Sequence, residues 1–184
     1  MNSDRQRNRR DLEHAVTEAN DNLFPAAGRI AAIDYGTVRI GVAVCDPDRI
    51  LASPLEVYAV RGREHDADYF RALVKMERLV GFIVGLPIHC DGGESQKSRE
   101  CREFAVWLNE QTNLPIRLFD ERFSTLDAKQ RLSTQKQSRA KRKKQLDAVA
   151  ALVLLESFLE ASRYNNAPAG QPLHQPPQGG APLS

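Results

Sequence analysis

The sequence predicts an α/β fold in which a mixed sheet of five strands carries helices on both faces. Three short apolar segments follow one another through tight turns from residue 30 onward. Two further apolar segments then alternate with amphipathic helical patterns, and a densely apolar helical pattern follows. A chain of 184 residues, of which 41% are hydrophobic, can bury one sizeable core, so one globular domain is expected.

The first three apolar segments predict a three-stranded antiparallel meander. Residues 30–34 are apolar without alternation until Asp34, which is typical of a strand covered on both faces. Further strands are predicted at 40–45 and 51–60, and the turns YGTVR and DPDR are short enough to join antiparallel neighbours.

Helices and strands alternate after the meander. A helix is predicted at 66–79, with one face marked by Tyr69, Leu73, Met76 and Val80. The segment GFIVGLP predicts a short buried strand, closed by glycine and proline. A helix at 95–111 follows, and its apolar face is Cys101, Phe104, Ala105 and Leu108.

The remaining elements complete the pattern. Pro115 opens a strand, IRLFDE, and Ser124 with Asp127 has the spacing that caps the start of a helix. A last helix at 144–163, rich in apolar residues, is expected to lie against the sheet. A meander followed by helix, strand, helix, strand and two helices is the order of a ribonuclease-H-like fold.

The two ends differ from this domain, which we place at residues 28–164. Residues 1–27 are charged and mixed in sign, and predict an extension with at most a short helix. Residues 165–184 hold five of the ten prolines and no charge, which predicts a disordered tail. No signal peptide or membrane helix is predicted, and three sparse cysteines favour a reducing compartment.

The net charge of +2 is unevenly distributed. One segment contains eight basic residues and no acid: Lys129, Arg131, Lys136, Arg139, Lys141, Arg142, Lys143 and Lys144. The rest of the chain therefore has a net charge of −6. A local concentration of positive charge indicates a site where a polyanion docks, and the alternative is a solvated surface loop.

Carboxylates stand at the ends of three predicted elements. Asp34 ends the first strand, Asp120 and Glu121 end the last one, and Asp147 lies early in the last helix. Such oxygen ligands suit Mg²⁺ or Mn²⁺. Each acid also has a simpler interpretation: Asp34 as a turn former, Asp120 and Glu121 as an exposed strand end, and Asp147 as a charge favoured near a helix N-terminus.

These segments resemble the YqgF family of Holliday-junction-resolvase-like proteins, also described as pre-16S rRNA nucleases. The resemblance covers about residues 29–160 and is carried by DYGTVRIGVAVCD, ASPLEVY, FIVGLP followed by DGG, LFDERFST and KKQLDAVAAL. It implies a ribonuclease-H-like fold, a cytoplasmic bacterial setting, and metal-dependent hydrolysis of phosphodiester bonds. It further implies a role in trimming the 5′ end of the small-subunit rRNA precursor, a step of ribosome biogenesis.

Matched residue by residue, the resemblance places the catalytic acids at Asp34, Glu121 and Asp147. These acids would hold Mg²⁺ or Mn²⁺, with Asp120 as an alternative metal ligand to Glu121. The residues expected to contact nucleic acid are Arg39, Arg122, Ser124, Thr125, Lys141, Arg142, Lys143 and Lys144. Ser124 has the alternative role of a helix cap.

The expected function is that of a metal-dependent nuclease acting on RNA as a monomer, with no membrane partner. One alternative is a non-catalytic RNA- or ribosome-binding factor, because related resolvases have an acid at the exit of the fourth strand, where this chain reads GLP. Another is cleavage of branched DNA, which normally needs a dimer. A kinase-like ATPase also uses Asp-x-Gly-Thr, but this chain is too short for its two domains.

Overall fold

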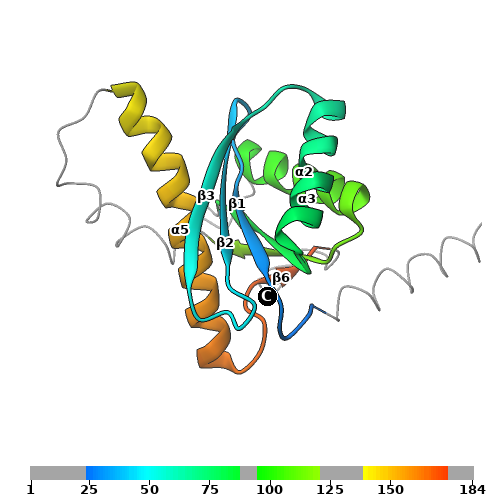
Figure 1. The fold of residues 1–184 in the computed structure, drawn as a ribbon, viewed down its shortest axis with the longest axis vertical. Coiled ribbons are helices and arrows are strands. Elements are labelled where there is room, and N and C mark those ends of the chain that lie inside the picture. Colours follow the sequence, from blue (N-terminus) through cyan, green and yellow to red (C-terminus); the bar gives the residue numbers. More distant parts are fainter. Residues whose placement is uncertain (1–23, 88–94, 121–138, 174–184) are drawn as a thin grey trace, which may run out of the picture.

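The computed structural model describes residues 24–87, 95–120 and 139–173, with side chains from residue 149 onward in the last range. Within these ranges six strands form one sheet, in the order β3-β2-β1-β4-β5-β6 (Figure 1). Their bounds are β1 Ile30–Asp34, β2 Arg39–Cys45, β3 Ala52–Ala59, β4 Gly81–Leu86, β5 Ile116–Asp120 and β6 Gln171–Pro172.

The sheet is mixed, as expected. The antiparallel meander β1–β2–β3 forms one half, while β4 and β5 add to β1 in parallel. Strand β1 is therefore central, and its residues from Ile30 to Ile33 are completely buried because both faces are covered. The expected fold class is confirmed, with six strands in place of five.

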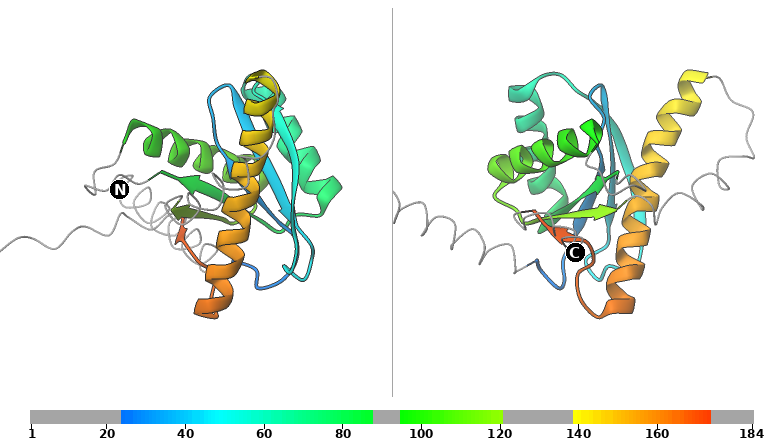
Figure 2. Two further views of the ribbon diagram at one scale, coloured as in Figure 1. Left: turned by 90° about the vertical axis from the view of Figure 1, so that its left-hand side faces the viewer. Right: turned by 180° about the vertical axis from the view of Figure 1, so that it is seen from behind.

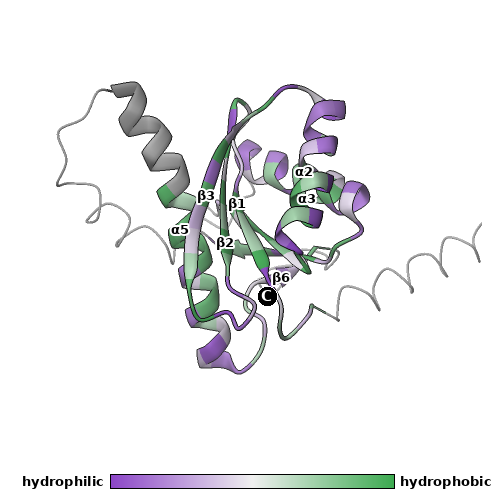
Figure 3. Cartoon of the chain, viewed as in Figure 1, coloured by the Kyte–Doolittle hydropathy of each residue, from purple (hydrophilic) through white to green (hydrophobic). Residues whose placement is uncertain are grey.

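Helices cover both faces of this sheet. Helices α2 (Arg63–Glu77) and α3 (Gln96–Thr112) lie on one face, and α5 (Arg139–Asn165) crosses the other (Figures 1 and 2). Most of β1 and β2 is apolar, whereas the exposed edge strand β3 and the outer sides of α2 and α3 carry polar residues (Figure 3). Alternation along the strands thus divides the core into two layers.

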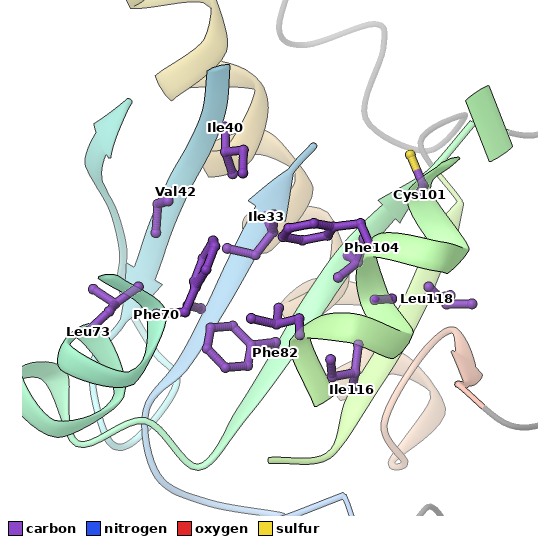
Figure 4. Close-up of a cluster of buried hydrophobic side chains, with 14 of the residues drawn as sticks. Ile33, Ile40, Val42, Phe70, Leu73, Phe82, Cys101, Phe104, Ile116 and Leu118 are labelled. Carbon is purple, nitrogen blue, oxygen red and sulfur yellow. The ribbon is translucent and has the colours of Figure 1, made fainter. Parts of the chain in front are cut away.

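The layer under α2 and α3 is rich in aromatic rings. Phe70 of α2 and Phe104 of α3 point toward each other and toward Phe82 of β4, with ring centroids 5.8 and 6.3 Å from Phe70 (Figure 4). The layer under α5 centres on Phe158, whose ring meets Phe119 at 5.7 Å and Phe24 at 6.0 Å. All these rings are at least nine-tenths buried.

Two elements differ in detail from the sequence-based expectation. The buried face of α2 is Asp66, Ala67, Phe70 and Leu73, whereas Met76, expected on that face, is 71% exposed. Helix α5 begins at Arg139 rather than at residue 144, so it includes part of the basic run. The helix expected after Ser124 lies outside the described residues.

The expectation of disorder from residue 165 onward is wrong for the part of the tail up to residue 173. This stretch returns to the sheet as β6, pairing antiparallel with β5. The Arg117 guanidinium of β5 donates to the carbonyl oxygens of Ala169 and Gly170 at 2.7 and 2.8 Å, and Leu173 is buried. Side-chain contacts distant in sequence therefore order a segment that its composition alone leaves disordered.

No described helix combines the length and the apolar character needed to cross a bilayer. Of the cysteines, Cys45 and Cys101 are reduced and buried, in agreement with simple packing roles.

Candidate functional site

The candidate site is the edge of the sheet where the parallel strands β1, β4 and β5 end. Asp34 is the last residue of β1 and Asp120 the last residue of β5, and both are half-buried. Because β4 separates the two strands, their ends lie about 10 Å apart. The carboxyl ends of central parallel strands are where open α/β sheets place their ligands.

Asp34 and Asp120 belong to opposite faces of the sheet. Ile30 and Ala32, which alternate with Asp34, pack in the layer under α5. Leu118, which alternates with Asp120, packs in the layer under α2 and α3. Asp34 therefore lies on the face that α5 covers, and Asp120 lies on the other.

The N-terminal part of α5 lies at the same end of the molecule as the turn after β1 (Figures 1 and 2). Asp147 belongs to this part of the helix backbone. Arg39, the first residue of β2, alternates with Ala43, which packs in the layer under α5, so Arg39 shares the face of Asp34. Since Asp34 pairs with Gly41, Arg39 stands diagonally across from Asp34 on the neighbouring strand.

The turn after Asp34 is built around a close backbone approach at Gly36. A Cβ atom at this position would lie 2.5 Å from the carbonyl oxygen of Arg39. Only glycine tolerates that approach without a shift of the backbone. Gly36 thus fixes the path of the chain between Asp34 and Arg39.

Lys97 also holds this turn, and the sequence did not reveal it. Its Nζ atom donates to the carbonyl oxygen of Tyr35 at 2.7 Å and lies 5.2 Å from the centroid of the Tyr35 ring. Lys97 comes from the first turn of α3, 62 residues away. Only a knowledge of tertiary contacts could have linked it to Asp34.

The start of α5 concentrates positive charge near this edge. The helix opens with RAKRKK, and no acid stands in its first turn. Basic residues at a helix N-terminus oppose the helix macrodipole. Helix stability therefore does not explain why basic residues stand at this end of α5. Their position favours a role in binding an anion.

The remaining expected residues are outside the described part of the chain. Glu121, Arg122, Ser124 and Thr125 fall in the range 121–138, and the side chains of Asp147 and of residues 141–144 are not described. Among the described side chains, no group of three acids, histidines or cysteines could hold a metal ion. The structure places Asp34, Asp120 and Arg39 at one sheet edge, while the full ligand set stays a prediction.

The mixed sheet is covered by α5 on one face and by α2 and α3 on the other, and its central strand ends on an acid. This arrangement defines a ribonuclease-H-like protein. The chain belongs to the RuvX family, whose model, described as "Holliday junction resolvase", matches residues 28–161. The resemblance to the YqgF family is thereby confirmed.

Relatives and solved structures agree with this membership. A Rhodopirellula baltica protein named "Putative pre-16S rRNA nuclease" is 62% identical over 155 residues, covering 84% of this chain and 89% of its own length. One of the same name from Koribacter versatilis is 36% identical, covering 72% of this chain and 87% of its own. The structure of Thermus thermophilus RuvC with a Holliday junction substrate covers 79% of this chain and 99% of its own, with a TM-score of 0.50 at 12% identity, and supports the fold alone.

Proposed function

We propose that this protein is a metal-dependent nuclease that processes the 5′ end of pre-16S rRNA. The observation that carries the proposal is the position of Asp34, at the end of the central strand and on the face crossed by the basic helix α5. The names of the relatives from Rhodopirellula and Koribacter support the RNA substrate. Its setting is the bacterial cytoplasm, and its working form is a monomer.

The donor set suits a hard divalent cation, Mg²⁺ or Mn²⁺. Asp34 is a half-buried carboxylate, and burial of such a charge is costly unless a cation or hydrogen bonds compensate it. Asp34, Glu121 and Asp147 would hold the cation, with Asp120 as the alternative to Glu121. Asp120 belongs to the opposite face from Asp34, which favours Glu121. A cation held there would supply a lowered pKa for a water nucleophile and charge neutralisation at the leaving oxygen.

The protein's own residues would position the phosphate. Arg39 shares the face of Asp34 and would bind a phosphate oxygen, while Lys97 and Gly36 hold the turn that orients Asp34. Arg122, Ser124 and Thr125 would complete the rim. The basic start of α5, Lys141 to Lys144, would bind the flanking backbone.

Branched DNA is the second candidate substrate. The description of the matching family model supports it. A chain that bound RNA without cutting it would instead be a ribosome-binding factor that retained the fold.

The test is cleavage of an end-labelled rRNA precursor with Mg²⁺ or Mn²⁺, beside a four-way DNA junction at the same salt concentration. Asp34→Asn is expected to lower the rate at least about 100-fold while RNA binding is retained. Asp48→Asn is the control, because this exposed acid lies in the turn between β2 and β3, at the opposite end of the sheet. Equal rates in wild type and Asp34→Asn would contradict the proposal.

A further inference from the structure

A cavity of about 230 Å³ opens beside the turn after Asp34, on the α2/α3 face of the sheet. Residues from the β1–β2 hairpin, from the start of α2 and from α3 line it. We call it the aromatic cavity and define it by Tyr35, Arg63, Glu100, Glu103, Phe104 and Trp107. Tyr35 follows Asp34 in the chain, with their Cα atoms about 3.8 Å apart, and its ring packs on the opposite face of the sheet from Asp34.

Three aromatic rings form the inner wall of the aromatic cavity. The rings of Tyr35 and Phe104 are stacked with centroids 4.4 Å apart, and Trp107 lies 5.6 Å from Phe104. The side of Phe104 away from the cavity packs into the core, where it points toward Phe70 (Figure 4). Trp107 is only half-buried, so part of its indole faces the cavity as a surface on which a planar ring can stack.

The rim combines both signs of charge. Glu100 and Glu103 come from α3 and Arg63 from α2. Both signs of charge border the same cavity as the Tyr35 ring. The Glu100 carboxylate accepts one exposed hydrogen bond, from the side-chain amide of Gln96 at 3.0 Å. A third lining acid, Asp66, is buried and accepts hydrogen bonds from the Tyr58 hydroxyl and the Arg61 amide at 2.7 and 2.9 Å.

We propose that the aromatic cavity binds a guanine base next to the scissile phosphate and gives the nuclease a sequence preference. The inference rests on the proposed function, since it assigns the substrate contact at the same sheet edge. Asp34 belongs to the α5 face and Tyr35 to the other, so the substrate strand would cross the end of the sheet, with its phosphate at Asp34 and the adjacent base in the cavity.

The arrangement of donors and acceptors selects guanine among the bases. Guanine presents two neighbouring donors, N1–H and the N2 amino group, which one carboxylate can accept together, and the acceptors O6 and N7, which suit a guanidinium. Adenine and cytosine each present one amino group beside a ring nitrogen that accepts, and uracil has a single N–H between two carbonyl oxygens. The alternative occupant is a basic side chain of a partner protein, which could pair with the two glutamates. Arg63 at the rim and Lys97 over the Tyr35 ring would repel such a side chain.

Trp107 provides a direct measurement, because it is the chain's only tryptophan. The full chain is titrated with the hexaribonucleotides UUGUUU, UUAUUU and a third with inosine in place of guanosine, in EDTA so that no cleavage occurs. The guanine oligonucleotide is expected to quench the fluorescence with an affinity about tenfold above the adenine one. Inosine, which lacks the N2 amino group, is expected to lie between them.

Glu100→Gln/Glu103→Gln is expected to abolish the preference for guanine, because an amide cannot accept both donors. Glu110→Gln is the matched control, since Glu110 is an exposed acid of the same helix and is not among the residues lining the cavity; it is expected to keep the preference. Equal quenching by all three oligonucleotides would overturn the inference, as would a preference that survives in the double variant. Quenching by an oligoarginine peptide but not by RNA would also overturn it.

A parallel cleavage assay with the same guanine and adenine sequences separates this inference from the proposed function. Cleavage that does not depend on guanine, together with equal quenching by all oligonucleotides, would overturn the inference but would still support the proposed nuclease function. Guanine-selective quenching in a chain that cuts neither RNA nor DNA would support the aromatic cavity as an RNA contact and contradict the nuclease.

Discussion

At the scale of single residues, the site depends on how tightly its turn is built. Asp34 ends a strand that cannot shift, because its preceding four residues are completely buried. Gly36 allows the backbone to turn back toward β2, and the hydrogen bond from Lys97 to Tyr35 links this turn to α3. Small changes here are therefore expected to move the carboxylate relative to the rest of the site.

Gly36→Ala is expected to lower the free energy of unfolding by about 1–3 kcal/mol. The added methyl group would meet a backbone oxygen, that of Arg39, which cannot move away without opening the turn. Urea denaturation followed by circular dichroism measures the change. An unchanged midpoint would show that the turn has room which the structure does not show.

Tyr58→Phe is expected to lower the free energy of unfolding at pH 7 by about 1–3 kcal/mol, since the buried Asp66 carboxylate loses a donor 2.7 Å away. Burial, and then the contact with Asp66, raises the pKa of Tyr58 from 10.0 to about 12. The folded state therefore holds this proton more tightly than the unfolded state does. The stability that the protonated Tyr58 hydroxyl contributes is therefore complete below pH 10 and is lost between about pH 10 and pH 12.

Denaturant titrations of wild type and Tyr58→Phe at several pH values test this prediction. The difference between the two proteins is expected to be constant up to pH 10 and to shrink toward pH 12. A difference that grows over this interval would contradict the assigned direction of the pKa shift.

At the scale of elements, the sequence predicted those whose pattern is local. The strands of the meander and the buried face of α3 are confirmed, because their runs and spacings of apolar residues leave little choice. Strand β6 was missed because the hydrogen bonds of Arg117 and the burial of Leu173 hold it in place. Neither contact produces a periodic pattern in the sequence. The start of α5 was missed because a run of basic residues carries no apolar face.

Helix α5 is expected to contribute most of the salt dependence of RNA binding. Lys143→Gln/Lys144→Gln is expected to weaken binding and to reduce the slope of log K against log salt by about 0.7 for each phosphate that the variant no longer neutralises. Lys75→Gln/Arg99→Gln, which neutralises two exposed cations of α2 and α3, is expected to leave the slope unchanged. Equal effects of the two variants on filter binding would mean that α5 has no special role.

The same helix anchors one layer of the core through Phe158. Phe158→Ala is expected to cost about 3–5 kcal/mol, because the ring is completely buried between Phe24 and Phe119. Tyr164→Ala, further along the helix at a position that is 91% exposed, is expected to cost less than about 0.5 kcal/mol. Thermal unfolding of both variants checks the contrast.

At the scale of the whole molecule, the two faces of the sheet carry different parts of the proposed site. The α5 face carries Asp34, Arg39 and the basic helix, and the α2/α3 face carries the aromatic cavity. The sequence alone singled out Asp34, because an acid at the end of an otherwise apolar strand is unusual, and its role as a metal ligand stays a prediction. It could not predict the aromatic cavity, because Tyr35 and Trp107 line one cavity only through the packing of α3 on the sheet.

Iron-directed backbone cleavage would locate the cation itself. Fe²⁺ replaces Mg²⁺ in oxygen-ligand sites, and with ascorbate and peroxide it generates radicals that cut the chain nearby. Mass spectrometry is expected to find cuts around residues 34–36, near 120–121 and near Asp147, all suppressed by excess Mg²⁺ and abolished in Asp34→Asn but retained in Asp48→Asn. Cuts that fall elsewhere, or that persist in Asp34→Asn, would contradict a metal site at the end of β1.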